Sequence, residues 1–138
     1  MQAKHDQWQT VVVADDNPKI LELIGRILGA GFKVIAQVAD GEALVEAVVR
    51  LQPHAAVVDL NMPGLGGIQA VRRFRRESRT AVVYLTGHTE PDVVQEALAA
   101  GGLGYVLKAS MAEDLIPAIE AALTGKLFLS PSLKIASA

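Results

Sequence analysis

Acidic and polar side chains stand at the ends of four short apolar runs. Asp15 and Asp16 follow the first run, Asp59 ends the second, Thr86 ends the third and Lys108 follows the fourth. Three carboxylates that meet at one point repel one another, and their pKa values rise unless a cation neutralises them. Carboxylates around a hard ion such as Mg²⁺, with an ammonium and a hydroxyl, can hold a phosphoryl group on an acid. The set therefore predicts aspartyl-phosphate chemistry.

The elements that must bring these side chains together are parallel strands. Apolar runs predict strands, and apolar stripes at helical spacing between them predict helices. Five such pairs predict an α/β fold of (βα)₅ type, in which the carboxyl ends of the strands share one rim. The predicted strands are Thr10–Ala14, Phe32–Ala39, Ala55–Asp59, Ala81–Thr86 and Gly104–Leu107. The first predicted helix begins at Asn17-Pro18, the second spans Glu42–Leu51, the third follows the glycine loop that ends at Gly67, the fourth begins at Pro91 and the fifth spans Met111–Thr124.

The bulk composition restricts the class of protein. The chain has 138 residues, of which 51% are hydrophobic, and this suits one domain with a proper core. A net charge of −2 gives no overall basic field for nucleic acid, and the absence of Cys excludes disulfide and thiolate chemistry. The polar start and the lack of any apolar run near ~20 residues predict a cytoplasmic protein without a membrane span.

Each polar position also has a purely structural interpretation. The pair Asp15-Asp16 can cap the following helix, Thr86 can be an ordinary strand residue, and Lys108 can be a solvated charge. Their joint occurrence on one predicted rim favours the functional interpretation. Pro117 lies inside the last predicted helix, so we expect a bend there or an irregular first turn.

Four motifs carry a resemblance that covers about Gln9–Thr124: VVVADDNP, VVDLNMPGLGG, VVYLTGH and GYVLKAS. Together they resemble the receiver domain of two-component response regulators. The resemblance implies a flavodoxin-like, doubly wound parallel sheet with strand order 2-1-3-4-5.

The resemblance also implies a role for each site residue. Asp59 would be phosphorylated, Mg²⁺ would be held by Asp16, Asp59 and the backbone carbonyl of Asn61, and Asp15 would orient a metal-bound water. Thr86 and Lys108 would bind the phosphoryl group and Tyr105 would be the switch aromatic. Asn61 and His88 each lie two residues past a site residue, and we expect them to modulate dephosphorylation, although His88 can also be a plain loop histidine.

The sequence after the fifth predicted strand indicates which group of receiver domains the chain resembles. Ala109 stands where many receivers have a cis proline, so we expect a trans bond before it. KAS and GKLFLSP resemble receivers of NarL/FixJ-type regulators, in which a linker leads to a helix-turn-helix domain. Residues 125–138 are thus expected to be a C-terminal tail or the start of a linker to an absent output domain, and we favour a truncated chain over a stand-alone receiver.

The expected function is a phosphorylation-dependent switch rather than an enzyme. A sensor histidine kinase would phosphorylate Asp59, and the surface of the fourth helix, fifth strand and fifth helix would change, with a possible homodimer as the result. DNA would be bound only through the absent domain. The rival of a haloacid-dehalogenase-type hydrolase fails because Asn61 stands where its second acid is required. A pseudo-receiver that is never phosphorylated stays open as the alternative.

The arginines around the third predicted helix and the histidines give no firm indication of function. Five arginines on and after the third helix suggest a solvated face, with direct nucleic-acid binding as the alternative: Arg72, Arg73, Arg75, Arg76 and Arg79. The histidines His5, His54 and His88 show no metal-ligand spacing.

Overall fold

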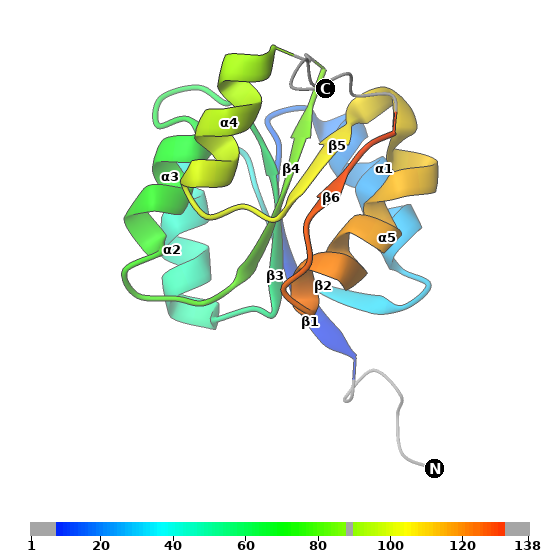
Figure 1. Cartoon of the computed structure of the whole chain (residues 1–138). Helices are drawn as coiled ribbons and strands as arrows, with labels where there is room; N and C mark the ends of the chain where they lie inside the picture. Colours follow the sequence, from blue (N-terminus) through cyan, green and yellow to red (C-terminus); the bar gives the residue numbers. More distant parts are fainter. Residues whose placement is uncertain (1–7, 88–89, 132–138) are drawn as a thin grey trace.

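A parallel sheet of six strands lies between two layers of helices in the computed structural model, which describes residues 8–87 and 90–131 (Figure 1). The strand order is β2-β1-β3-β4-β5-β6. The strands are β1 (Gln9–Ala14), β2 (Phe32–Val38), β3 (Ala55–Asp59), β4 (Ala81–Thr86), β5 (Gly104–Leu107) and β6 (Phe128–Leu129). The helices are α1 (Pro18–Leu28), α2 (Gly41–Leu51), α3 (Gly67–Phe74), α4 (Pro91–Ala99) and α5 (Met111–Leu123), with a 3₁₀ turn η2 (Lys108–Ser110) before the last.

The predicted α/β class and the strand order 2-1-3-4-5 are confirmed, and the predicted strand and helix bounds agree with the structure to about one residue. The sixth strand was not predicted. It pairs in parallel with β5 and continues the sheet beyond it, as the red strand beside β5 in Figure 1. Part of the segment after Gly125 therefore belongs to the folded domain.

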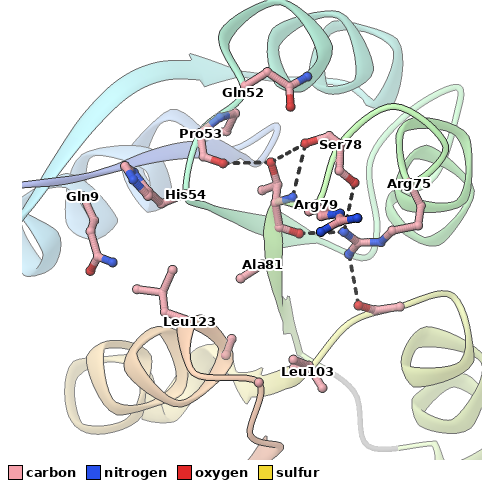
Figure 2. A pocket seen from close by; sticks show the side chains of 14 residues that line it. Gln9, Gln52, Pro53, His54, Arg75, Ser78, Arg79, Ala81, Leu103 and Leu123 are labelled. Carbon is pink, nitrogen blue, oxygen red and sulfur yellow. Dashed lines mark hydrogen bonds between the residues drawn. The ribbon is translucent and has the colours of Figure 1, made fainter.

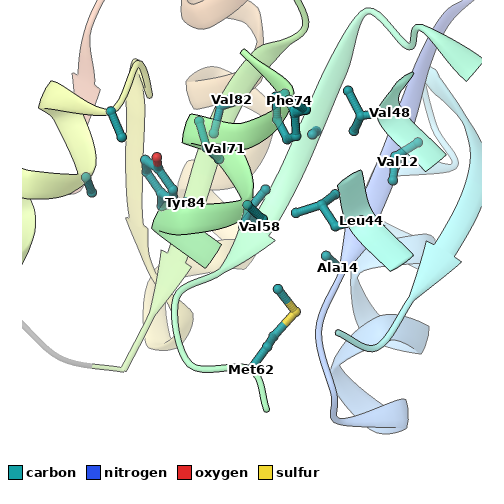
Figure 3. Packing of buried hydrophobic residues seen from close by; sticks show 14 of the residues in the cluster. Val12, Ala14, Leu44, Val48, Val58, Met62, Val71, Phe74, Val82 and Tyr84 are labelled. Carbon is teal, nitrogen blue, oxygen red and sulfur yellow. The ribbon is translucent and has the colours of Figure 1, made fainter. Parts of the chain in front are cut away.

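Each face of the sheet has its own apolar core. Alternate strand residues such as Val12, Val58 and Tyr84 point to α2, α3 and α4 (Figure 3). Their neighbours, such as Val13 and Val57, pack on the other face against α1 and α5. Burial on both faces explains why the central strands β1, β3 and β4 are apolar runs instead of alternating ones, whereas the edge strand β2 includes the exposed Lys33 and Gln37. The two cores hold the central strands, and hence their carboxyl ends, in fixed positions.

Two glycines allow the loop after β3 to lie close to its neighbours. A Cβ on Gly67 would meet the backbone carbonyl oxygen of Asp59, and one on Gly41 would overlap the backbone of Leu65. The first helical turns of α3 and α2 can therefore approach this loop only because both residues lack a side chain. The close approach places the loop at the rim where Asp59 lies.

The last helix continues through Pro117, which is exposed. The irregular backbone expected near this helix occurs before it, as the 3₁₀ turn Lys108–Ser110. Within the described residues no peptide bond is cis, so the bond between Lys108 and Ala109 is trans as expected. No helix in this part of the chain is long and apolar enough to cross a bilayer.

Candidate functional site

Three carboxylates converge at the carboxyl ends of β1 and β3. One oxygen each from Asp15, Asp16 and Asp59 lies within 4.8 Å of the others. Adjacent pairing of β1 with β3 brings the carboxyl ends of the two strands side by side. The predicted meeting of these acids is confirmed, at the crossover point where doubly wound sheets hold their ligands.

Asp59 is almost completely removed from solvent, with 1% of its surface exposed. Burial raises the pKa of this carboxyl above its ordinary value, and the nearby charge of Asp15 raises it further. The backbone N–H of Asn61 opposes this effect by donating a hydrogen bond to Asp59 Oδ1 at 3.1 Å. The two raising effects outweigh this hydrogen bond, so the negative charge of the buried Asp59 carboxylate is only partly compensated.

Lys108 brings a positive charge to two of the acids. Its ammonium Nζ lies 3.2 Å from Asp15 Oδ2 and 3.4 Å from Asp59 Oδ2. Burial disfavours the charged form of Lys108, but the two carboxylates outweigh that effect and raise its pKa. The side chain is only 28% exposed. The ammonium is therefore bound within the site, and its interpretation as a free solvated charge is wrong.

The capping role is divided among the residues at the end of β1. Asn17 caps α1, because its side chain accepts a hydrogen bond from the N–H of Lys19. Asp15 uses one oxygen in a turn, where Oδ1 accepts from the N–H of Asn17 at 2.9 Å. Its second oxygen faces Lys108. Asp16 is exposed, so its carboxylate remains accessible to a ligand at the rim.

Thr86 lies at the end of β4, between the strands that carry Asp59 and Lys108. It is buried, and its register partner Leu107 directly precedes Lys108. Asn61 is exposed and follows β3 by two residues. The fold thus brings Thr86 and Asn61 to the same rim as the acids.

Tyr105 is fully buried on the face covered by α4. Its ring centroid lies 6.4 Å from that of Tyr84, its register partner on β4. Burial raises the pKa of its hydroxyl, and the hydroxyl of Thr86 partly opposes this. Tyr105, the expected switch aromatic, therefore points inward in this structure.

The donor set at this rim suits a hard divalent cation. Three carboxylates that converge next to a single ammonium leave an excess of negative charge. Asp15 Oδ2 is buried and has the Lys108 ammonium as its ion-pair partner. Oxygen donors with room for water at an exposed acid are typical of Mg²⁺ sites. The residues present therefore fit the predicted metal.

Some predicted residues are not part of this cluster. His88 lies outside the described residues. Arg72, Arg73, Arg76 and Arg79 are exposed on and after α3, and Arg72 lies 3.7 Å from Glu96 of α4. His54 lies at the opposite end of the sheet, where Thr10 N donates to its Nδ1 at 3.0 Å.

A hollow also lies at that opposite end, with a volume of about 620 Å³ (Figure 2). Arg75 spans it and donates to the carbonyl oxygens of Ser78, Thr80 and Gly101 at 3.3, 2.8 and 3.0 Å. The hydroxyls of Ser78 and Thr80 are 2.7 Å apart, and Thr80 Oγ1 donates to the carbonyl of Pro53. These groups satisfy one another, so the hollow has no unsatisfied set of side chains comparable to the acidic rim.

Sequence reasoning missed one polar residue near the rim. Ser130 lies directly after β6, is 1% exposed, and hydrogen-bonds to the end of β5 and to α5. A strand of two residues has no measurable periodicity, so only the short apolar run before Pro131 could have indicated it.

Comparison with known proteins agrees with the geometry. Residues 11–120 match the model of the response regulator receiver domain family. The transcriptional regulatory protein NarL of Mycobacterium tuberculosis is 33% identical over 126 residues, which cover 89% of this chain and 58% of that protein. The chain therefore spans little more than half the length of this relative.

Solved structures show the same likeness. A two-component response regulator of the LuxR family from Aurantimonas sp. SI85-9A1 superposes with a TM-score of 0.88 at 32% identity, covering 94% of this chain and 96% of that one. The isolated receiver domain of RcsB from Salmonella enterica serovar Typhimurium, in the presence of phosphomimetic BeF₃⁻, gives 0.81 at 28% identity over 92% and 96%. The chain therefore belongs to the receiver domains of two-component response regulators, of the NarL/FixJ type.

Proposed function

We propose that this receiver accepts a phosphoryl group on Asp59 from a sensor histidine kinase, with Mg²⁺ as the cofactor. The observation that carries the proposal is the convergence of three carboxylates and the Lys108 ammonium at one rim of the sheet. A carboxylate can attack phosphorus, and cationic groups stabilise the charge on the transferred oxygens.

The residues at the rim would have separate roles in binding the metal and in binding the phosphoryl group. Asp16, Asp59 and the backbone carbonyl of Asn61 would hold the metal, and Asp15 would orient a water bound to it. The metal would supply charge neutralisation for the phosphoryl oxygens. Lys108 would follow those oxygens from its present place between the two acids, and Thr86 would donate to them from the end of β4.

The output would be a shift in population between two states. A phosphoryl group adds about −1.5 to −2 charge and three acceptor oxygens, so it favours the state in which Thr86 and Lys108 approach Asp59. With Thr86 drawn forward, Tyr105 is held inward, and the surface formed by α4, β5 and α5 changes. That change would control a homodimer or a neighbouring domain.

The biological role would be control of transcription in the cytoplasm. The relative described above is named as a transcriptional regulatory protein, and this chain spans 58% of it. A helix-turn-helix domain beyond the receiver would bind DNA, and the receiver itself would act as a regulatory domain and not as an enzyme with its own substrate.

The test uses acetyl phosphate as a small phosphodonor with Mg²⁺, and mass spectrometry of the intact chain. We expect one phosphoryl group per chain, none in Asp59→Asn, and none in excess EDTA. No incorporation in the parent chain would favour the alternative of an interaction module that is never phosphorylated. Continuous turnover of phosphomonoesters would instead indicate a hydrolase.

His88 keeps its proposed role in dephosphorylation. His88→Ala should change the lifetime of the phosphorylated chain, measured by loss of the phosphorylated mass with time, and leave thermal stability unchanged. Equal lifetimes in the parent and the variant would make His88 an ordinary loop residue.

A further inference from the structure

The segment that follows α5 is attached to the strand that carries the switch tyrosine. Phe128 N donates to the carbonyl of Leu103 at 2.8 Å, and Ser130 N donates to the carbonyl of Tyr105 at 3.0 Å. Both bonds belong to the parallel pairing of β6 with β5. This segment begins after residue 120, where the match to the family model ends. The family match therefore assigns no role to it.

The hydroxyl of Ser130 joins three elements. Ser130 Oγ accepts from the N–H of Leu107, the last residue of β5, at 3.1 Å. The same hydroxyl donates to Asp114 Oδ2, in the first turn of α5, at 2.8 Å. With 1% exposure it has little access to water that could replace either partner. Removing the hydroxyl would leave a backbone N–H and a carboxylate without these bonds.

The bond to Leu107 lies one residue from the site. Lys108 follows Leu107 directly, and its ammonium lies 3.2 Å from Asp15 and 3.4 Å from Asp59. The position of the Leu107 peptide therefore sets where the Lys108 side chain starts. We propose that Ser130 is a positioning residue for Lys108, and that it couples docking of β6 to the phosphoryl group on Asp59. The inference rests on the proposed function of Asp59.

Whether a phosphoryl group on Asp59 favours or disfavours docking of β6 can be inferred from the features that occur together in this structure. Tyr105 is inward, Lys108 is paired with the acids, and β6 is docked through Ser130, all in one conformation. The inward Tyr105 and the Lys108 contact are the features proposed above for the phosphorylated state, and the docked β6 accompanies them in this structure. A phosphoryl group should therefore favour the docked strand, and undocking the strand should weaken phosphoryl binding by the same factor, because linkage is reciprocal.

The experiment measures both directions of this coupling on the whole chain. Beryllofluoride with Mg²⁺ serves as the phosphoryl mimic, and its affinity is measured by titration for the parent, Ser130→Ala and Asp114→Ala. Native-state hydrogen exchange of the Phe128, Ser130 and Leu107 amides is recorded with and without the mimic.

Three control variants separate positioning from general stability. Asp114→Asn keeps an acceptor for the Ser130 hydroxyl, Thr124→Ala removes an exposed hydroxyl outside this network, and Val34→Ala trims the distant edge strand β2. We expect Ser130→Ala and Asp114→Ala to weaken binding about fivefold or more, and the controls to bind like the parent. In the parent, the mimic should slow exchange at the three amides by a similar factor.

The experiment distinguishes failure of the positioning role of Ser130 from failure of the proposed function of Asp59. If the parent binds beryllofluoride and Ser130→Ala binds it no more weakly than an equally destabilised Val34→Ala, the positioning role is overturned while the proposed function stands. Unchanged amide exchange on binding would overturn it as well. A parent chain that does not bind the mimic would overturn both proposals. If Ser130→Ala does not fold, Asp114→Ala decides the outcome in the same way.

Discussion

The polar groups at the two ends of the sheet differ in how well they are satisfied by protein partners. At the amino ends of the strands, Arg75 donates to three carbonyls, and the hydroxyls of Ser78 and Thr80 hydrogen-bond to each other and to Pro53. At the carboxyl ends, three acids share one ammonium, and burial raises the pKa of Asp59.

This difference separates a structural polar network from a functional one. Buried groups that satisfy each other stabilise the fold and leave nothing for a ligand. Buried charges that are under-compensated destabilise the fold until a cation arrives. If this difference is real, substitutions and metal binding at the two ends of the sheet should change stability in different ways.

Arg75→Met should destabilise the fold most, by about 3 kcal/mol, because it leaves several backbone carbonyls without a donor. Urea unfolding measures the loss, with Arg76→Met on the exposed face as the matched control. Phosphorylation of the folded variant should equal that of the parent. A loss under 1 kcal/mol would mean that water replaces the guanidinium and that this end is less well organised than its geometry indicates.

Lys108→Met should cost about 2 kcal/mol in metal-free buffer, because Asp15 and Asp59 lose the cation between them. The physical reason predicts a second effect, since added Mg²⁺ should restore more stability to the variant than it adds to the parent. Thermal unfolding with EDTA and with Mg²⁺ measures both. Equal metal responses in the two chains would contradict a charge deficit at this rim.

Mg²⁺ alone should stabilise the parent by about 1.4 kcal/mol at ten times its dissociation constant, as expected for a ligand that binds only the folded state. The stabilisation should reverse with EDTA and be absent in Asp16→Asn. A stabilisation of the same size by Mg²⁺ in Asp16→Asn would place the cation elsewhere on the surface.

Asp59→Asn should raise the free energy of unfolding by about 1 kcal/mol at neutral pH without metal. Burial raises the pKa of Asp59, so the folded chain binds this proton more tightly than the unfolded chain, and ionisation destabilises the fold. The advantage of the variant should therefore shrink as the pH falls through the folded pKa towards the ordinary value of 3.8. Glu46→Gln, an exposed acid on α2, is the control and should show little of this pH dependence.

The sequence alone determined the alternation of strands and helices and the rim at which the acids meet. The central strands β1, β3, β4 and β5 are apolar runs and each helix carries an apolar stripe, and these local patterns are strong enough to fix bounds to about one residue. Once the strands are parallel, residues at their carboxyl ends must share one edge. That is why Asp15, Asp59 and Lys108 could be placed together before any coordinates.

Only the tertiary structure decided how those groups are held. The ammonium of Lys108 lies between two particular acids, and Tyr105 is inward, because side-chain positions depend on packing from several elements at once. Strand β6 and Ser130 depend on the same cause, since they are held by backbone and hydroxyl bonds to β5 and α5 across the chain. A strand of two residues is too short to show a hydrophobic period in the sequence. This strand forms because it pairs with β5 at the edge of the sheet.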